Sequence, residues 1–241
     1  MKNPAAPRCL IVNADDFGLS PGVNRGILQA HAHGIVTSAS LMVRWPAAVA
    51  AADLARGQPA LSVGLHLDLG EWTYADGDWR PAYQVVAVDD AQAVAEELAR
   101  QLAAFRRLLG RDPTHIDSHQ HVHRSEPVRS IVLAEARKLG VVVRHCDAAV
   151  RYCGQFYGQS DKGYPYPEGI SVAALVGLLR DLPAGVTEMG CHPAAAADLD
   201  SMYCDERTVE LQTLCDVRVR DTLAAEGIGL RSFAGLGGAW S

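Results

Sequence analysis

Short runs of β-branched and other apolar residues alternate along this chain with longer stretches in which apolar residues recur every three or four positions. The short runs predict buried strands, and the longer stretches predict amphipathic helices. The predicted strands cover residues 9–13, 36–43, 61–67, 114–118, 141–144, 186–191 and 228–232. The predicted helices cover residues 22–33, 46–56, 91–109, 127–139, 172–182 and 206–226.

Cap residues support these boundaries, as the first helix illustrates. Ser20 is a suitable N-cap, Pro21 stands at the first helical position where proline is favoured, and Gly34 follows the predicted end. Because strand–helix alternation implies helical crossovers between parallel strands, we expect an α/β fold. A distorted or incomplete (β/α) barrel of about seven parallel strands suits this length best, and a doubly wound open sheet is the alternative.

The pattern indicates one domain. Because no internal repeat, low-complexity tract or linker interrupts it, we expect residues 1–241 to form a single barrel domain. Residues 1–7 precede the first strand, and we expect them to form a flexible tail. Two connections, residues 70–88 and 147–169, are unusually long and rich in aromatic residues. Connections of that length in a compact domain commonly carry function.

Composition narrows the class of protein. Hydrophobic residues make up 49% of the 241, so the chain can bury a full core and is not disordered overall. The net charge of −6 argues against a nucleic-acid partner. No run approaches the ~20 apolar residues that span a bilayer, and no signal peptide is recognisable. The six cysteines lack C-x-x-C spacing, so we expect reduced thiols and a cytoplasmic protein.

The first predicted strand leads into the sequence Asn-Ala-Asp-Asp-Phe-Gly, which places the carboxylates of Asp15 and Asp16 side by side. Two carboxylates at the end of a buried strand are costly unless a cation or a metal ion meets them. An ordinary turn is the alternative, since Asp is common in turns and Gly18 permits a bend. The pair alone leaves both interpretations open.

A histidine-rich segment is the strongest signal for a metal or catalytic site. Four of the nine histidines lie in the segment His-Ile-Asp-Ser-His-Gln-His-Val-His at residues 115–123. The odd positions of this segment hold His115, Asp117, His119, His121 and His123. Alternate side chains of an extended chain share one face, so we expect these five to converge. Imidazole is a common ligand of catalytic metal ions.

Two more histidines belong to predicted strands. His66 lies in strand 61–67, where a lone histidine is more often a core residue, but beside the other clusters a ligand is the better interpretation. His192 stands between Cys191 and Pro193, and the proline ends the strand there. Catalytic groups of barrels collect at such strand ends. We interpret Cys191 as a small buried residue rather than a nucleophile.

Together, the Asp pair and the strand-end histidines indicate a catalytic metal site, because structural zinc sites are closed by four protein ligands. A carboxylate and an imidazole left uncoordinated would act as base and acid. Two imidazoles and a carboxylate suit zinc, and Fe, Ni, Co and Mn stay open as alternatives.

Taken in order, these segments resemble the motifs of a known family. Asn-Ala-Asp-Asp-Phe-Gly at 13–18, Gly-Leu-His at 64–66, Thr-His-Ile-Asp-Ser-His-Gln-His-Val-His at 114–123 and Cys-His-Pro at 191–193 are similar to those of the YdjC-type carbohydrate deacetylases. That family includes chitooligosaccharide and hopanoid-associated deacetylases and is related to the NodB-type polysaccharide deacetylases. The resemblance covers residues 10–233, nearly the whole chain.

The resemblance implies a distorted (β/α) barrel that binds one divalent metal ion, zinc or magnesium. It implies that Asp16, His66 and His119 are the ligands, that Asp15 is the general base and that His192 is the general acid. The implied activity is metal-dependent hydrolysis of an N-acetyl group from an amino sugar or its conjugate. Mixed imidazole and carboxylate ligation favours zinc.

The candidates for substrate binding lie around this set. They are Asp68, Trp72, His121, His123 and Tyr157, since aromatic faces suit a pyranose ring and polar groups bond its hydroxyls. The alternative for the aromatic residues is packing of the long connections onto the barrel. Two rival functions stay open: an O-acetyl sugar esterase with the same site, and a non-catalytic sugar-binding relative. The sequence specifies no oligomeric state and leaves a homodimer open.

Overall fold

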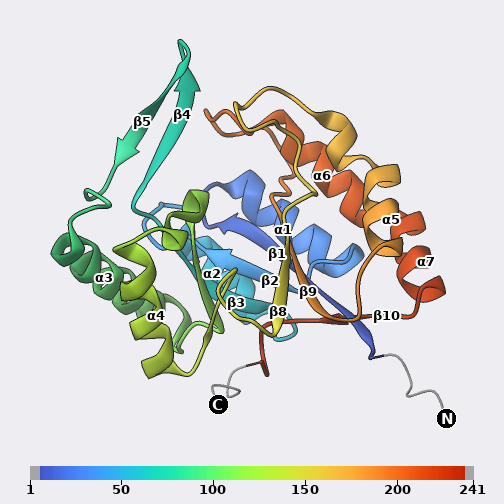
Figure 1. The fold of residues 1–241 in the computed structure, drawn as a ribbon, viewed down its shortest axis with the longest axis horizontal. Coiled ribbons are helices and arrows are strands. Elements are labelled where there is room, and N and C mark those ends of the chain that lie inside the picture. Colours follow the sequence, from blue (N-terminus) through green and yellow to red (C-terminus); the bar gives the residue numbers. More distant parts are fainter. Residues whose placement is uncertain (1–5, 237–241) are drawn as a thin grey trace.

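One curled sheet of parallel strands runs through the computed structural model, which describes residues 6–236; residues 1–5 of the predicted tail lie outside this part. The strand order is β7–β6–β3–β2–β1–β9–β8, and β10 pairs with the first half of β1 (Figure 1). The strands are β1 (Arg8–Phe17), β2 (Ser38–Leu41), β3 (Ser62–Leu67), β6 (His115–Ser118), β7 (Val142–Val143), β8 (Val150–Cys153), β9 (Gly185–Cys191) and β10 (Ile228–Arg231). Among the described strands, β7 and β8 end the order without pairing each other, so the predicted incomplete barrel is confirmed.

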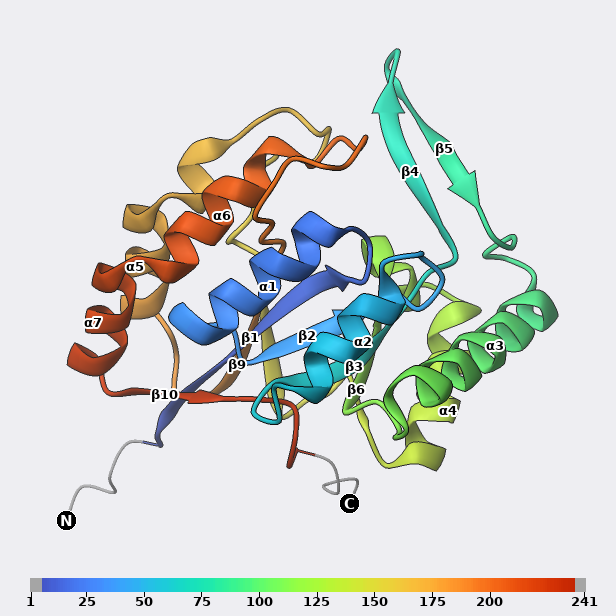
Figure 2. The same cartoon turned by 180° about the vertical axis from the view of Figure 1, so that it is seen from behind.

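Helices cover the outside of this sheet. In Figures 1 and 2, α3 and α4 lie on one flank, α5 to α7 on the other, and α1 and α2 between them. The helices are α1 (Pro21–His33), α2 (Ala48–Arg56), α3 (Ala91–Leu109), α4 (Val128–Leu139), α5 (Val172–Arg180), α6 (Asp205–Cys215) and α7 (Val217–Ala225), with 3₁₀ helices at His119–Arg124 and Pro167–Ile170. Within residues 6–236, no helix has the length and apolar character that crossing a membrane requires.

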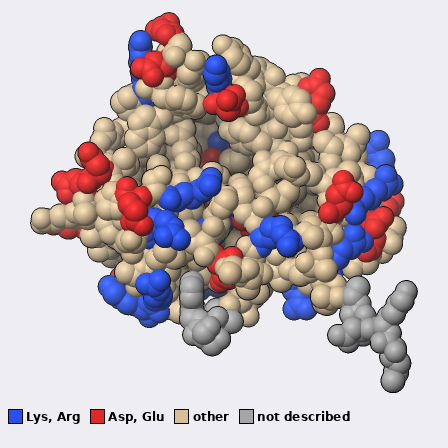
Figure 3. Space-filling view, viewed as in Figure 1, with Lys and Arg blue, Asp and Glu red and all other residues tan. Residues whose placement is uncertain are grey.

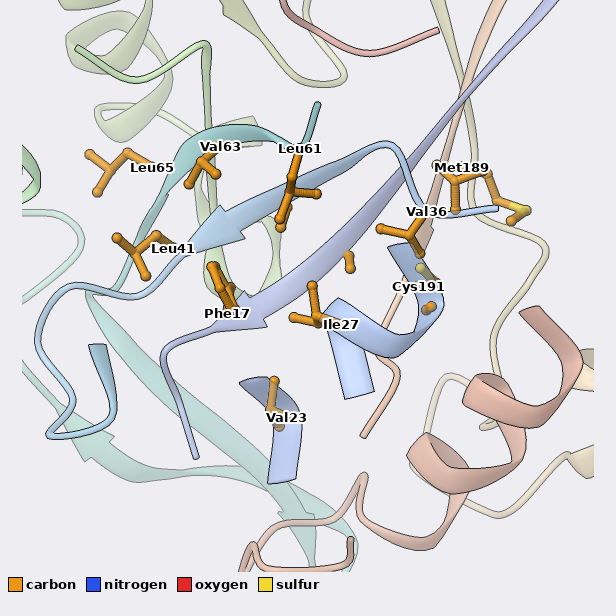
Figure 4. Close-up of a cluster of buried hydrophobic side chains, with 14 of the residues drawn as sticks. Phe17, Val23, Ile27, Val36, Leu41, Leu61, Val63, Leu65, Met189 and Cys191 are labelled. Atoms are coloured by element: carbon orange, nitrogen blue, oxygen red, sulfur yellow. The ribbon is translucent and has the colours of Figure 1, made fainter. Parts of the chain in front are cut away.

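The core between α1 and the sheet follows from the local sequence. The Ser20 hydroxyl accepts a hydrogen bond from the backbone N–H of Val23 at 3.0 Å, which fixes the start of α1 as predicted. Val23 and Ile27 then face Phe17 and Leu41 of the sheet (Figure 4). These side chains are fully buried, and each contributes about 1.5–3 kcal/mol by leaving water.

Along β1, alternate residues serve different layers. Leu10 and Val12 belong to the apolar cluster that also includes the helices, whereas Ile11 packs with Val142 and Phe233 in a separate cluster. This two-residue period is the expected consequence of strand geometry. Asn13 and Asp15 continue the face of Ile11 toward the carboxyl end of β1. This face of the strand therefore changes from apolar to polar side chains where the strand approaches its end.

A hairpin replaces the irregular connection expected at residues 70–88. Strands β4 (Gly70–Ala75) and β5 (Asp78–Gln84) pair antiparallel and project from the barrel in both ribbon views (Figures 1 and 2). Asp76 and Gly77 form the turn with φ of 52° and 85°. An Asp-Gly turn between strands is a hairpin signal in the sequence, and the expectation of a plain connection was therefore wrong.

Two other expectations fail. The single helix predicted at 206–226 is two helices, because Asp216 is extended and its side chain accepts from the N–H of Arg218 at 2.8 Å, capping α7. The connection predicted at 147–169 contains β8, which adds an eighth strand to the sheet beside β9.

Candidate active site

A cavity of about 650 Å³ opens at the carboxyl ends of the strands. Figure 3 shows it as a hollow in the middle of the face, with charged side chains of both signs at its floor. Trp72 and Trp79 of the hairpin line one part of the wall, and Tyr157 and Tyr203 line another. Barrels place their active sites at this end, so the cavity is the candidate site.

Three side chains from three strand ends converge at the cavity. Each of Asp16, His66 and His119 offers one ligand atom, and these atoms all lie within 4.8 Å of one another. The Asp16 Oδ1 atom is 3.3 Å from His66 Nε2 and 3.2 Å from His119 Nδ1. One carboxylate oxygen and two imidazole nitrogens at such spacing can surround a single metal ion.

A bulge in β1 brings both neighbouring carboxylates to the same site. Adjacent residues of a regular strand point to opposite faces. Here the pairing of β1 with β2 shifts register between Ala14 and Phe17, and Asp16 has φ of 67°, in the left-handed region. This local twist turns Asp15 and Asp16 together into the cavity, and the surrounding contacts hold the strained backbone.

The histidine-rich segment does not stay extended, which corrects the expectation that its odd positions share one face. The strand ends at Ser118, and a 3₁₀ helix follows in which Gln120 and His121 have φ of 49° and 55°. Only His119 reaches the three-residue cluster. His121 contacts the Tyr152 hydroxyl at 3.2 Å on the cavity wall.

The remaining two histidines of the segment are buried away from the cavity. His115 stacks on Phe233 with ring centroids 4.0 Å apart. His123 bonds the backbone oxygen of Arg144 at 3.0 Å and the Ser118 hydroxyl at 2.6 Å. Burial lowers the pKa of each histidine to about 4, so both are neutral packing residues.

His66 is oriented by a second carboxylate. Its Nδ1–H donates to Asp117 Oδ1 at 2.8 Å, which leaves Nε2 facing Asp16. A histidine held in this way by a carboxylate is typical of metal ligands, because the bond fixes both tautomer and ring orientation. Burial opposes protonation of His66, yet Asp117 outweighs it and raises the pKa of this imidazole well above its usual value.

Asp15 is buried beside a guanidinium that no sequence pattern had singled out. Arg144 NH1 lies 2.7 Å from both Asp15 oxygens and 3.0 Å from Asp117 Oδ2. Burial alone would raise the pKa of Asp15, but Arg144, His66 and His192 together lower it. Asp15 is therefore an ionised carboxylate in the floor of the cavity, able to accept a proton.

His192 stands across from Asp15. Its Nε2 is 3.8 Å from Asp15 Oδ2, and its Nδ1 is 3.6 Å from Glu210 Oε1. The carboxylate of Glu210 also accepts from the His192 backbone N–H and from the Tyr203 hydroxyl. The imidazole thus lies between two carboxylates and lines the cavity, as expected for a residue that follows β9 directly.

The structure divides the five candidates for sugar binding. Trp72, His121 and Tyr157 line the cavity, whereas Asp68 and His123 do not. Asp68 is fully buried and accepts hydrogen bonds from the Tyr83 hydroxyl at 2.9 Å and from other groups of the protein. Its carboxylate therefore holds the hairpin and does not face the cavity, which argues against the predicted role in sugar binding.

Several polar residues of the site are absent from the sequence-based candidates. They are Glu71, Arg144, Tyr152, Tyr203, Arg207 and Glu210. Arg144 ends a predicted strand, so its position at the carboxyl edge could have been noticed. The charged residues of α6 carry no such signal, because a helix with charges at these spacings is ordinarily a solvated surface helix.

The fold and the cluster define an α/β half-barrel protein with a candidate Asp–His–His metal centre at the carboxyl ends of its strands. Residues 9–225 match the model of the family described as YdjC-like protein. The chain belongs to this family.

Named relatives support this membership. A chitooligosaccharide deacetylase of Serratia marcescens is 37% identical, over 95% of this chain and 99% of the relative. A chitooligosaccharide deacetylase of Klebsiella pneumoniae is 36% identical, over 94% and 98%. The match extends through nearly the whole length of both proteins.

Solved structures show the same architecture. A protein of Enterococcus faecalis, named provisionally as a cellobiose-phosphate cleavage protein, superposes with a TM-score of 0.77 at 27% identity, over 97% of this chain and all of that one. A family 4 carbohydrate esterase from Streptomyces lividans in complex with acetate superposes with a TM-score of 0.53 at 15% identity, over 94% and 93%. The second likeness concerns the fold alone.

Proposed function

We propose that this protein is a metal-dependent carbohydrate deacetylase that hydrolyses the N-acetyl group of an amino sugar. The observation that carries the proposal is the convergence of Asp16, His66 and His119 beside Asp15 and His192 at one cavity. The relatives named as chitooligosaccharide deacetylases support the choice of an N-acetylated sugar as substrate.

The residues present fit a divalent metal ion. Asp16 Oδ1 is buried and has no hydrogen-bond partner among the described residues, although it faces two imidazoles. A buried carboxylate oxygen without a partner is costly unless a cation meets it. Two nitrogens and one oxygen, with room left at the cavity, are typical of catalytic zinc, and magnesium is the alternative to test.

Each residue of the chain has a role in the proposed hydrolysis. An ion held by Asp16, His66 and His119 would supply a Lewis acid that activates water and polarises the acetyl carbonyl. Asp15, ionised beside Arg144, takes the proton of the attacking water. His192, held by Glu210, donates a proton to the departing nitrogen as the amide C–N bond breaks.

The cavity wall is suited to a sugar. Trp72, Trp79 and Tyr157 present aromatic faces, and the hydroxyl of Tyr152 and the imidazole of His121 add polar groups among them. Pyranose rings have an apolar face and polar edges that match this mixture. We propose that these residues bind the sugar that carries the acetyl group.

The deciding experiment measures acetate release from chitobiose that carries either N-acetyl or O-acetyl groups, with zinc or magnesium added to chelator-treated protein. Release from the N-acetyl sugar that depends on added metal is the expected result. Release from the O-acetyl sugar alone would instead establish an esterase. A chain that binds the sugar but releases no acetate from either would be the non-catalytic relative.

A further inference from the structure

Arg207 of α6 is a buried cation in the floor of the site, and nothing in the proposed reaction yet uses it. Its side chain is only 4% exposed, and it is the one Lys or Arg among the described residues that line the cavity. The NH2 group lies 2.6 Å from Asp16 Oδ2, and Nε donates to the backbone oxygen of Tyr203 at 2.8 Å. The third nitrogen, NH1, is buried and has no partner among the described residues.

The NH2 contact fixes the direction of Asp16. Because Oδ2 is bound to Arg207, Oδ1 is the oxygen left facing His66 Nε2 and His119 Nδ1. Asp16 also has a left-handed backbone, which persists only where surrounding contacts hold it, and the ion pair with Arg207 is one of these contacts. A residue that orients a ligand in this way usually affects metal affinity, because the ligand set must be preorganised.

Contacts with neighbouring segments of the same chain fix the position of Arg207. Its backbone oxygen accepts from the N–H of Ala194 at 3.1 Å, which ties the start of α6 to the segment just after His192. The guanidinium also lies over the ring of Tyr203, 5.7 Å from its centroid. The unused NH1 is therefore part of a rigid group, as a preorganised hydrogen-bond donor requires.

The geometry assigns Arg207 to the active centre: NH2 holds Asp16 in the ligand orientation, and NH1 donates a hydrogen bond to the acyl oxygen of the substrate. Negative charge develops on that oxygen when water adds to the carbonyl, so a donor aimed there stabilises the transition state more than the ground state. This inference rests on the proposed function, because it needs both a bound metal ion and an acyl substrate.

Two substitutions separate the two contacts. Arg207→Met removes both, whereas Arg207→Lys keeps a cation that can reach Asp16 but lacks the planar fork that also serves Tyr203 and the cavity. Exposed Arg218 of α7, which pairs only with Asp216, gives the matched control Arg218→Met. The measurements are zinc titration by calorimetry, thermal unfolding of the metal-free proteins, and kcat and KM for N,N′-diacetylchitobiose.

We expect Arg207→Met to lower zinc affinity about 10–100-fold, and both variants to lose about 10²–10³-fold in kcat with little change in KM. Arg207→Lys should keep zinc affinity within about tenfold of wild type, since Asp16 stays paired. A purely structural role would lower the unfolding temperature without separating zinc affinity from kcat in this way.

Other outcomes are equally decisive. Metal-free variants that do not fold would make Arg207 a structural residue and overturn the inference, as would zinc affinity and kcat near wild type in both. An Arg207→Lys variant with full kcat would show that the proposed hydrogen bond from NH1 to the acyl oxygen does not contribute to the reaction. Wild-type protein that binds no zinc or magnesium would instead overturn the proposed function, so the two failures are distinguishable.

Discussion

At the scale of single residues, the floor of the site is a problem of charge balance. The carboxylates of Asp15, Asp117 and Glu188 surround the guanidinium of Arg144, and all four side chains are buried. Three buried carboxylates around one cation do not all ionise readily, because like charges disfavour one another. Burial raises the pKa of Glu188 to about 8 despite Arg144, whereas the pKa values of Asp15 and Asp117 are lowered. Glu188 therefore keeps its proton while Asp15 stays ionised.

The proton on Glu188 makes a pH-dependent contribution to stability. Its pKa is about 8 in the folded protein, above the ordinary value of 4.5, so between these values the folded state binds a proton that the unfolded state lacks. Stability from this group is present at low pH and falls as pH rises, by up to about 1.4 kcal/mol per pH unit. Glu188→Gln cannot titrate, so urea unfolding from pH 5 to 8 should show a flatter decline than wild type. Parallel curves for the two proteins would contradict the assignment.

Asp15 is the next residue whose chemistry can be isolated. Asp15→Asn keeps the shape of the side chain and all three candidate ligands, but amide oxygens do not accept the proton of a water at neutral pH. We expect zinc binding near wild type and a loss of about 10²–10⁴-fold in kcat. Calorimetry and acetate release measure the two effects. Asp112→Asn, which alters an exposed carboxylate paired with Arg106, is the control that should change neither. Substantial turnover by Asp15→Asn would show that Asp15 is not the general base.

His192 is tested through the leaving group. An amine must gain a proton to depart, whereas the phenolate of an activated aryl ester leaves without one. His192→Ala should therefore slow cleavage of an N-acetyl sugar by about 10²-fold or more and slow cleavage of an aryl acetate much less. The two substrates serve as controls for each other in one protein preparation. Equal slowing of both reactions would indicate a role in binding or packing.

The sequence predicts which residues meet in the site better than it predicts their surroundings. The family resemblance implies Asp16, His66 and His119 as ligands, and the structure brings them together because they lie at or near the carboxyl ends of parallel strands, which meet at one edge of the sheet. The ion pairs of Arg144 with Asp15 and of Arg207 with Asp16 could not be predicted, since the partners lie 129 and 191 residues apart in the sequence. Such pairings depend on how helices and strand ends dock, and local patterns do not encode that.

At the scale of elements, the hairpin and the turn that bears His119 are joined by one side chain. The Gln120 amide accepts from the backbone N–H of Trp72 at 2.9 Å and donates to its backbone oxygen at 2.8 Å. In this way the amide pairs with β4 as a neighbouring strand would. The left-handed backbone at Gln120, which ends the extended segment, is what places the amide there. The left-handed turn at Gln120, which the sequence did not predict, thus links the hairpin to His119, a candidate metal ligand.

Removing this link should loosen the hairpin and spare the chemistry. Gln120→Ala loses two hydrogen bonds worth about 0.5–1.5 kcal/mol each. We expect faster proteolysis within residues 70–84 and a several-fold higher KM for diacetylchitobiose, with kcat close to wild type. Gln92→Ala on α3, where the side chain bonds only Glu96 and does not line the cavity, is the matched control. A fall in kcat without a change in KM would show that the link acts on His119 instead.

The bounds of helices with a strong apolar periodicity were predicted well. Breaks and turns that depend on a single residue were not. The helix over 91–109 agrees with α3 at both ends, since Asp90 caps it and Gly110 ends it with φ of 69°. The break at Asp216 was missed because the apolar period continues across it. The hairpin was missed because its strands are largely exposed and lack the alternation typical of a half-buried sheet.

At the scale of the whole molecule, the candidate ligands join three separate segments of the sheet. Asp16 belongs to β1, His66 belongs to β3, and His119 comes from the turn after β6. Among the described strands the barrel is open between β7 and β8. Side chains pack across this gap: Arg144 lies 5.4 Å from the ring centroid of Tyr152, and the tilted ring of His145 lies 4.0 Å from the same centroid. An ion at the cluster would therefore connect three segments of an unclosed sheet.

Metal binding should for this reason stabilise the entire fold. A ligand that binds only the folded state adds about 2.7 kcal/mol at a concentration of 100 times its Kd. For a chain of this size, that corresponds to a rise of about 5–10 °C in Tm. We expect chelator-treated protein to show this rise when zinc is restored, and His66→Ala to show almost none, because one of three ligands is gone. Cys215→Ala, on the opposite end of α6 from the site, should respond like wild type. If zinc raised the Tm of His66→Ala as much as that of wild type, the stabilising ion would bind elsewhere, and Asp16, His66 and His119 would not form the metal centre.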